Sequence, residues 1–443
     1  MSKRPNRKPL PQQPVEAQIE SFTHDGRGVA HVAGKAVFIS GALPGESVRF
    51  AYSSMRRDFA EGRAVEVISA SPQRVEPRCL HFSLCGGCSL QHLAEEAQIH
   101  EKQQLLLDQF RRLGKVEPQA LFTPLVGPHW GYRHKARLGV KWVPKKNKVL
   151  VGFREKGSAL IAEIDRCVVL HPSVGERLQD IANMIAQLSI RDRLPQIEVA
   201  VSDARAALVL RTLEPPSPED LEVVIAFGKR FGFDIHLQPG GPETVYPIYP
   251  ENPPPLSYAL PDQHIDFRFR PTDFTQVNVQ INRQMVTRVL EIVQPQAEDR
   301  ILDLFCGIGN FTLPLARLAQ FAVGVEGGRE AVERARENAR DNDLNNVEFH
   351  VADLTQMQDH VPWAHHRYDK VLLDPSRAGA QEILAYVPKW QARRIVYVSC
   401  NPSALARDAG ILVHQHGYRL MQAGVMDMFP NTAHVESIAL FER

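Results

Sequence analysis

Short β-branched runs alternate with helical stretches from about residue 271 onward, and this alternation most constrains the fold. The expected strands are 301–305, 322–326, 347–351, 369–374 and 394–399, and the expected helices are 311–319, 328–341, 380–388 and 402–415. Such alternation gives a parallel sheet with helices on both faces. We therefore predict an α/β, Rossmann-like domain over 271–443, with its ligands at the carboxyl ends of the strands.

The remaining residues predict further domains, because 443 residues exceed what one core usually contains. We expect a disordered basic arm at 1–12, and a five-stranded barrel of the OB type at 13–70. A central, mixed α/β domain is expected at 71–270, with a helix at 93–113. The proline-rich stretch 239–261 is expected to form a long connection.

The composition is that of a globular protein, with 44% hydrophobic and 23% charged residues and a net charge of +1. No apolar run is long enough to span a bilayer, and the basic N-terminus is not followed by the apolar stretch of a secretory signal. Six cysteines in a chain of this length do not predict a disulfide framework. A reducing, cytoplasmic location is expected.

Two glycines after the first predicted strand of the α/β domain, Gly307 and Gly309, indicate a tight turn that approaches a ligand. The third glycine of a dinucleotide-binding loop is missing. Acidic residues lie on or at the end of three successive strands, at Asp303, Glu326 and Asp353. A carboxylate after the second strand suits the ribose of either NAD or S-adenosylmethionine. The missing glycine and the three acids together favour S-adenosylmethionine.

A cysteine follows the fifth predicted strand, in Ser399-Cys400-Asn401-Pro402. A thiolate beside a methyl donor has a specific use, since carbon 5 of a pyrimidine is a weak nucleophile. Addition of the thiolate to carbon 6 activates carbon 5 toward the methyl group, and a base then removes the carbon-5 proton. Cys400 is the candidate nucleophile.

Four motifs together resemble the RNA uracil-C5 methyltransferases, a family with a class I S-adenosylmethionine methyltransferase fold. They are Asp303-Leu304-Phe305-Cys306-Gly307-Ile308-Gly309-Asn310, Asp374-Pro375-Ser376-Arg377, Ser399-Cys400-Asn401-Pro402 and His434-Val435-Glu436. Phe274-Thr275-Gln276-Val277-Asn278 is similar to a further family segment. The resemblance implies Cys400 as nucleophile and Glu436 as base. It implies a methyl-donor site of Gln276, Phe305, Asn310, Glu326, Asp353 and Asp374. Asp374 is the alternative base, and Cys306 is interpreted as structural.

Three further cysteines, Cys79, Cys85 and Cys88, are clustered, and Cys167 can supply a fourth thiolate after folding. Four thiolates suit either zinc or an iron–sulfur cluster, and the spacing does not separate these two. Members of the resembled family with this cysteine set carry a [4Fe-4S] cluster. The resemblance therefore implies an iron–sulfur site in the central domain.

Residues 130–156 mix basic side chains with aromatic rings, as single-stranded RNA surfaces do. The basic residues are Arg133, Lys135, Arg137, Lys141, Lys145, Lys146, Lys148, Arg154 and Lys156. A solvated hairpin face is the alternative interpretation. The N-terminal barrel is similar to the RNA-binding TRAM domain through Asp25-Gly26-Arg27-Gly28-Val29-Ala30 and Leu43-Pro44-Gly45-Glu46. The order barrel, four cysteines and methyltransferase domain implies a monomeric enzyme that acts on 23S ribosomal RNA.

Three other functions are weighed against this one. An RNA cytosine-C5 methyltransferase would carry its nucleophile after the fourth strand, where this chain has Ser376. An NAD-dependent oxidoreductase conflicts with the missing third glycine. A non-catalytic RNA-binding protein predicts a lost nucleophile or base, and this sequence has both.

Overall fold

The computed structural model describes residues 10–443, and the chain divides into two compact units. The first unit contains the residues up to Ser83 together with 87–102 and 431–434. The second contains 84–86, 103–430 and 435–443. Most of the arm expected at 1–12 lies outside the described residues.

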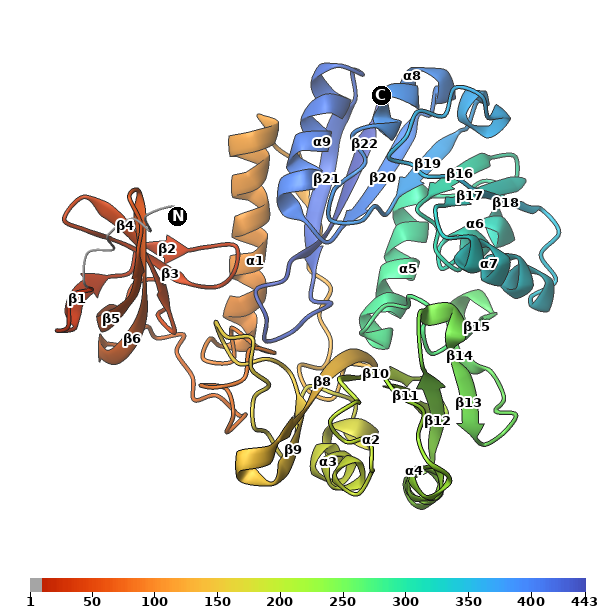
Figure 1. Cartoon of the computed structure of the whole chain (residues 1–443). Helices are drawn as coiled ribbons and strands as arrows, with labels where there is room; N and C mark the ends of the chain where they lie inside the picture. Colours follow the sequence, from red (N-terminus) through yellow and green to blue (C-terminus); the bar gives the residue numbers. More distant parts are fainter. Residues whose placement is uncertain (1–9) are drawn as a thin grey trace, which may run out of the picture. The chain divides into compact units, whose positions relative to one another are not determined.

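The first unit has one six-stranded sheet with the order β1-β5-β6-β4-β3-β2 (Figure 1). Its strands are β1 (Val15–Gln18), β2 (Ser21–Phe22), β3 (Gly28–Val32), β4 (Lys35–Ser40), β5 (Ser47–Met55) and β6 (Phe59–Ser69). Apolar side chains such as Ile39 and Phe50 form its core. Glu46 is fully buried, accepts a 2.8 Å hydrogen bond from the Leu43 N–H and pairs with Arg74 at 2.6 Å. The expected short strands are therefore present, with one more than predicted.

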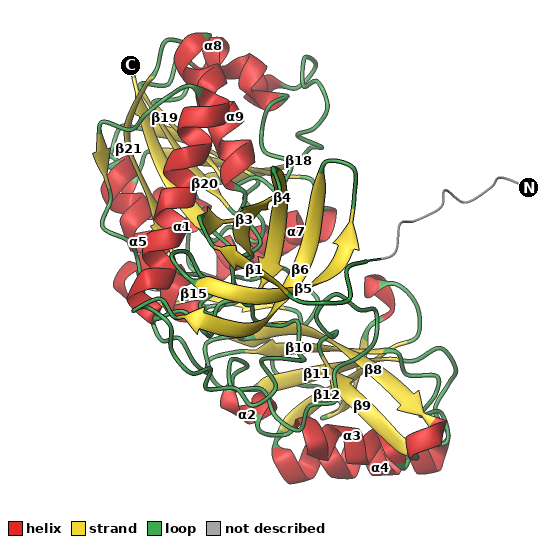
Figure 2. Cartoon of the chain, turned by 90° about the vertical axis from the view of Figure 1, so that its left-hand side faces the viewer, coloured by secondary structure: helices red, strands yellow, loops and turns green. Residues whose placement is uncertain are grey.

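Helix α1 (Glu95–Gln109) contributes residues to both units and continues as a π-helical turn at Phe110–Gly114. Next in the second unit comes a sheet with the order β13-β12-β11-β10-β8-β9. Its strands are β8 (Lys135–Val143), β9 (Lys148–Gly152), β10 (Gln196–Val201), β11 (Ala206–Arg211), β12 (Phe233–Gln238) and β13 (Tyr246–Tyr249). Apolar residues of α3 (Leu178–Ala186) and α4 (Pro218–Phe231) pack on one face of this sheet, beside the short α2 (Pro172–Gly175) (Figure 2).

The larger sheet of the second unit has the order β18-β17-β16-β19-β20-β22-β21-β7. Its strands are β16 (Arg300–Leu304), β17 (Phe321–Glu326), β18 (Val347–Val351), β19 (Lys370–Leu373), β20 (Arg394–Ser399), β21 (Arg419–Met426), β22 (Glu436–Glu442) and β7 (Ala120–Leu121). Neighbouring strands are parallel except on both sides of β22, which runs antiparallel to β20 and β21.

Helices cover this sheet as the alternation predicts. They are α5 (Val279–Val293), α6 (Thr312–Leu318), α7 (Arg329–Asp341), the short α8 (Val387–Trp390) and α9 (Pro402–His414). Alternate residues of β20 face different partners. Val396 and Val398 belong to the core that includes α5, whereas the Tyr397 hydroxyl bonds Asp408 of α9.

Two expectations were wrong. The stretch 239–261 is not a long connection, because it forms β13 and most of the hairpin strand β14 (Leu256–Leu260), which pairs with β15 (Ile265–Phe269). The helix expected at 380–388 is replaced by a 3₁₀ turn at Ile383–Tyr386 and the single turn of α8.

A buried ion pair joins the start of β19 to Asp299, the residue before β16. Lys370 is 3% exposed, and its ammonium donates to the Asp299 carboxylate and to the Gln294 carbonyl after α5. Arg393 also pairs with the fully buried Asp299, but it is 58% exposed. Asp299 thus depends mainly on Lys370 for a desolvated counter-charge.

We expect Lys370→Ala to lower the free energy of unfolding by about 3–5 kcal/mol, because it leaves a buried carboxylate without its partner. Arg393→Ala is the matched control and should cost about 0–1 kcal/mol, since an exposed pair is screened by water. Urea unfolding followed by circular dichroism measures both. Equal losses for the two variants would contradict this assignment.

Candidate active site

Strand pairing determines where Cys400 and Glu436 lie. β20 and β22 are antiparallel, and Ser399 pairs with Ser437. Cys400 follows Ser399 and Glu436 precedes Ser437, so both lie at the same end of adjacent strands. The buried Ser437 hydroxyl donates a 3.0 Å hydrogen bond to the Ser399 carbonyl and locks this register. The nucleophile and the base predicted from the sequence are thereby brought together.

Helix α9 begins directly after the thiol. The side chain of Asn401 caps the helix by accepting a 3.1 Å hydrogen bond from the Ser403 N–H. The Asn401 N–H in turn donates to the Ser399 hydroxyl at 3.1 Å. The turn that carries the half-buried Cys400 is therefore held on both sides.

Burial and neighbouring carboxylates keep both reacting groups protonated at neutral pH. Burial, then Glu436 and Asp374, raises the pKa of Cys400 to about 11, against an opposing effect of Arg377. Burial and Asp374 raise the pKa of Glu436 to about 8, and Arg377 again opposes them. A cation entering this site would lower both pKa values.

Two further acids belong to the same cluster. Burial and the neighbouring Glu326 raise the pKa of Asp374 to about 7. Burial raises the pKa of Asp303 to about 8 although the Thr312 hydroxyl donates a 2.5 Å hydrogen bond to Oδ2. Within residues 10–443, Asp303 Oδ1 is buried and has no hydrogen-bond partner. Four carboxyl groups thus lie close enough together to raise one another's pKa values although Arg377 is nearby, which fits a positively charged ligand.

The turn after β16 approaches the site with its backbone. Gly307 and Gly309 have φ angles of +55° and +91°, which favour glycine. Phe305 also has a positive φ, +66°, which is strained for an aromatic residue. The Phe305 N–H donates to the Val325 carbonyl at 2.8 Å. This turn supports the predicted cofactor role of Phe305.

Glu326 closes the turn from the next strand. Its carboxylate accepts hydrogen bonds from the N–H groups of Gly307 at 3.2 Å and Gly328 at 2.9 Å. The buried Cys306 lies between Phe305 and Gly307. Burial, with Asp303 and Glu326, raises the pKa of its thiol well above the usual value. Cys306 therefore remains a protonated core residue.

The amide of Asn310 is committed to protein contacts. It exchanges two hydrogen bonds with Asn282 of α5, at 3.0 and 2.9 Å. The Tyr258 hydroxyl also donates to Asn310 Oδ1 at 2.8 Å. These bonds attach the cofactor turn to α5, so a role in holding the turn fits Asn310 better than direct binding through its side chain.

Asp353 and Gln276 have no hydrogen bond to the cofactor turn among those described above. Asp353 is exposed after β18, and its Oδ1 accepts from the Thr355 N–H at 3.0 Å and hydroxyl at 2.6 Å, which lowers its pKa. Gln276 lies two residues before Asn278, which caps α5. It is half-buried, near the helix turn that bonds Asn310.

Lys135 holds the segment that carries Gln276. Its buried ammonium donates to the carbonyls of Pro271 at 2.5 Å and Asp273 at 2.9 Å, and burial lowers its pKa to about 8. The Lys135 ammonium is therefore committed to backbone carbonyls, which reduces the charge that the 130–156 surface offers to RNA. Phe274 in the same segment is 74% exposed and offers a ring to a base.

Acidic residues from outside 130–156 compensate part of its predicted positive charge. Arg137 pairs with Glu198 at 2.6 Å, and Lys146 and Lys148 both pair with Glu163, at 2.6 and 2.9 Å. The surface available to RNA is thus less basic than the local sequence indicates.

Within residues 10–443, no group of three or more His, Cys, Asp or Glu side chains is arranged to hold a metal ion. Two of the predicted ligands, Cys79 and Cys88, belong to the first unit, and the other two, Cys85 and Cys167, to the second. The iron–sulfur site therefore stays a prediction from the sequence.

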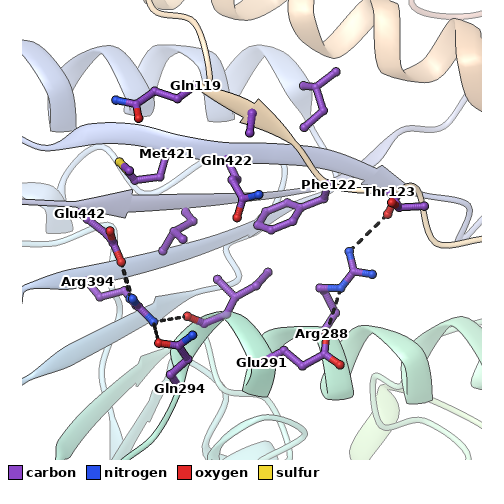
Figure 3. A pocket seen from close by; sticks show the side chains of 14 residues that line it. Gln119, Phe122, Thr123, Arg288, Glu291, Gln294, Arg394, Met421, Gln422 and Glu442 are labelled. Atoms are coloured by element: carbon purple, nitrogen blue, oxygen red, sulfur yellow. Dashed lines mark hydrogen bonds and ion pairs between the residues drawn. The ribbon is translucent and has the colours of Figure 1, made fainter.

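A cavity of about 770 Å³ lies at the opposite end of the larger sheet (Figure 3). Arg394 at the start of β20 and Glu442 at the end of β22 line it, whereas Cys400 and Glu436 are at the other ends of these strands. This cavity is therefore separate from the cluster of Cys400 and Glu436.

Sequence reasoning assigned no role to several residues that shape the site. Ser437 and Thr312 act through partners elsewhere in the chain, on which no local pattern reports. Lys135 was assigned to the RNA surface, whereas its ammonium holds the backbone at Pro271 and Asp273. Arg377 belongs to the motif Asp374-Pro375-Ser376-Arg377. A cation three residues after a strand-end acid is the sequence signal that indicates its electrostatic role.

Alkylation of Cys400 by iodoacetamide should accelerate from pH 6 to 9, by at most about tenfold per pH unit, because the thiolate fraction rises while pH stays below the thiol pKa. Ionised Glu436 raises that pKa. Glu436→Gln should therefore react faster than wild type above pH 8, where the carboxylate is charged, and similarly at pH 6. Peptide mass spectrometry measures the rates. Glu442→Gln, on the same strand, is the control, and an identical profile for Glu436→Gln would contradict the coupling.

Comparison with known proteins gives two family models. The model described as tRNA (Uracil-5-)-methyltransferase matches residues 256–443, and the TRAM domain matches 12–65. A relative from Methylococcus capsulatus is 62% identical over 443 residues, covering 100% of both chains. One from Alkalilimnicola ehrlichii is 53% identical, covering 99% of this chain and 98% of the relative. Both are named 23S rRNA (uracil(1939)-C(5))-methyltransferase RlmD.

Among solved structures, the Pyrococcus abyssi tRNA (uracil-54, C5)-methyltransferase, in complex with S-adenosyl-L-homocysteine, superposes with a TM-score of 0.72. It is 24% identical and covers 96% of this chain and 99% of its own, which shows a shared fold. In residues 10–443, no helix combines the length and apolar character needed to cross a membrane.

The full-length relatives, the TRAM match and the methyltransferase fold agree with the site geometry. The chain belongs to the RlmD family of 23S rRNA (uracil-C5)-methyltransferases, which use S-adenosylmethionine.

Proposed function

We propose that this chain methylates carbon 5 of one uridine in 23S ribosomal RNA, the nucleotide numbered 1939 in the names of its relatives, through a covalent adduct with Cys400. The observation that carries the proposal is the antiparallel register of β20 and β22, which aligns a thiol and a carboxyl group at one strand end. The proposed reaction needs one nucleophile and one base, and this pair supplies both.

S-adenosylmethionine supplies the methyl group as a sulfonium cation. The cluster of Asp303, Glu326, Asp374 and Glu436 fits that charge, and the unpartnered Asp303 Oδ1 indicates a missing donor. Phe305, Glu326 and Asp374 are the proposed direct contacts, with Gln276 and Asp353 at the edges of the site. Asn310 holds the turn through Asn282.

Cys400 acts first. Its thiolate forms a bond to carbon 6 of the uracil, and the electron pair of the carbon 5–carbon 6 bond moves toward the carbonyl oxygen at carbon 4. Arg377 favours the thiolate, because its positive charge lowers the pKa that burial raises. The thiol gives up its proton to water before this attack. The electron pair then returns through carbon 5 to the methyl carbon, the methyl–sulfur bond breaks, and S-adenosylhomocysteine leaves as a neutral thioether.

Glu436 acts second. Its carboxylate removes the proton from carbon 5, the double bond re-forms, and the thiolate leaves carbon 6. Once the positive charge of the methyl donor is lost, the buried carboxylate becomes a stronger base. Glu436 therefore gains basicity at the step that requires it.

The exposed ring of Phe274 and the TRAM barrel support RNA as the substrate class. A target base must leave its stack to reach a half-buried thiol, and an exposed ring beside the site can receive it. We propose that the enzyme acts as a monomer.

Cys400→Ala should abolish both methylation and every covalent protein–RNA species. Glu436→Gln should instead accumulate a methylated adduct, because methyl transfer is possible but proton removal is not. RNA containing 5-fluorouridine should trap the wild-type enzyme similarly, since fluorine does not leave as a proton does. Denaturing gels detect the adduct as a slow band that requires S-adenosylmethionine.

Glu442→Gln, at the other end of β22, is the matched control and should turn over like the wild type. An adduct that persists in Cys400→Ala would assign the nucleophile to another residue, and mapping the labelled peptide would identify it.

We also propose a [4Fe-4S] cluster on Cys79, Cys85, Cys88 and Cys167, supported by the cysteine set of the sequence. Protein purified without oxygen should be brown and contain about four iron atoms per chain, and Cys88→Ser should bleach it. Colourless protein with one zinc per chain would exclude the cluster. Cys306→Ser is the control, because Cys306 is buried in the methyltransferase core.

A further inference from the structure

Three side chains of α9 bind the backbone of the loop after β19. Asn401 Nδ2 donates to the Arg377 carbonyl at 2.8 Å. Arg407 Nη2 donates to the Ala378 carbonyl at 2.9 Å, and Asp408 Oδ2 accepts from the Ala380 N–H at 2.7 Å. The helix and its cap thus hold the loop backbone at Arg377, Ala378 and Ala380.

Asp408 is the centre of this arrangement. It is fully buried, and its Oδ2 also accepts a 2.6 Å hydrogen bond from the Tyr397 hydroxyl on β20. Its Oδ1 accepts from Arg407 Nε at 2.8 Å and pairs with Nη2 at 2.7 Å. A buried carboxylate needs such partners. Asp408 on α9 therefore connects the loop after β19 with β20.

The loop approaches α9 so closely that one position accepts only glycine. Gly379 has a φ of +87°. A Cβ there would overlap Arg407 Nη2 and lie 2.7 Å from Asp408 Oδ2. The close packing of the loop against α9 therefore depends on Gly379, a residue without a side chain that could react.

Both sides of the contact lead to reacting groups. The loop begins with Asp374 and Arg377. The helix begins at Pro402, two residues after Cys400 and one after its cap, Asn401. Arg377 lowers the pKa of Cys400 and of Glu436, so its effect depends on where the loop is held.

We propose that Asp408 is a positioning residue, which fixes the loop of Arg377 against the helix of Cys400 and thereby keeps the arginine charge beside the thiol and the base. The inference rests on the proposed reaction of Cys400. According to this inference, Asp408, a buried acid that does not contact the substrate, controls the reactivity of the Cys400 thiol.

The test compares Asp408→Asn with wild type in the full-length protein. Asparagine can still accept hydrogen bonds but cannot pair with Arg407. We expect alkylation of Cys400 at pH 8 to slow by roughly three- to tenfold, because a pKa rise of one unit reduces the thiolate tenfold. Adduct formation with 5-fluorouridine RNA should fall roughly 10- to 100-fold. The Kd for S-adenosylmethionine should stay within about twofold.

Gly379→Ala is the second variant, because it displaces the loop and leaves Asp408 intact. It should give the same signature, and the double variant should be no worse than the more impaired single one. If Asp408→Asn does not fold, Gly379→Ala alone decides. Asp220→Asn is the matched control, since Asp220 is also buried and accepts from the Ser189 N–H at 2.6 Å, but it lies on α4, away from Cys400 in the sequence and in another core.

Wild-type alkylation and adduct rates in a folded Gly379→Ala or Asp408→Asn variant would overturn the proposal. Alkylation is read without RNA, so its result does not depend on the proposed reaction. An adduct that survives Cys400→Ala would overturn the reaction but leave the alkylation result valid.

Discussion

The antiparallel pairing of β20 with β22 is the contact on which the site depends. It joins a thiol from one strand to a carboxyl group 36 positions later in the sequence, with a serine–serine hydrogen bond between them. A shift of one residue would turn either side chain to the other face of the sheet. The register is therefore a condition for chemistry as much as for stability.

The second constraint is charge. Carboxyl groups at the ends of β16, β17, β19 and β22 are close enough to raise one another's pKa values. The strands hold this unfavourable cluster in place. Asp408 fixes the loop after β19, and the Asn282–Asn310 pair fixes the turn after β16. A site assembled in this way is prepared for a cation before the cation arrives, so little reorganisation is needed on binding.

The sequence predicted β16 to β20 almost to the residue, because each is a short apolar run followed by a turn, but it did not predict β22, the strand that carries Glu436. The motifs also indicated Cys400 and Glu436. It did not predict that residues 120–121 supply the edge strand of a sheet formed mainly after residue 300, since two residues carry no periodicity. Nor did it predict the partners of three lysines. Lys135 binds the carbonyls of Pro271 and Asp273, and Lys146 and Lys148 pair with Glu163, all of which lie outside the 130–156 stretch.

The position of β22 also affects the order in which the protein becomes competent during synthesis. β22 is made after β20 and β21 but lies between them. A nascent chain that stops before residue 436 therefore has the nucleophile, but its sheet has two open edges and no base. Sheet closure and placement of Glu436 depend on the same segment, so under the proposed reaction a chain that lacks β22 would have the thiol but no base to resolve its adduct.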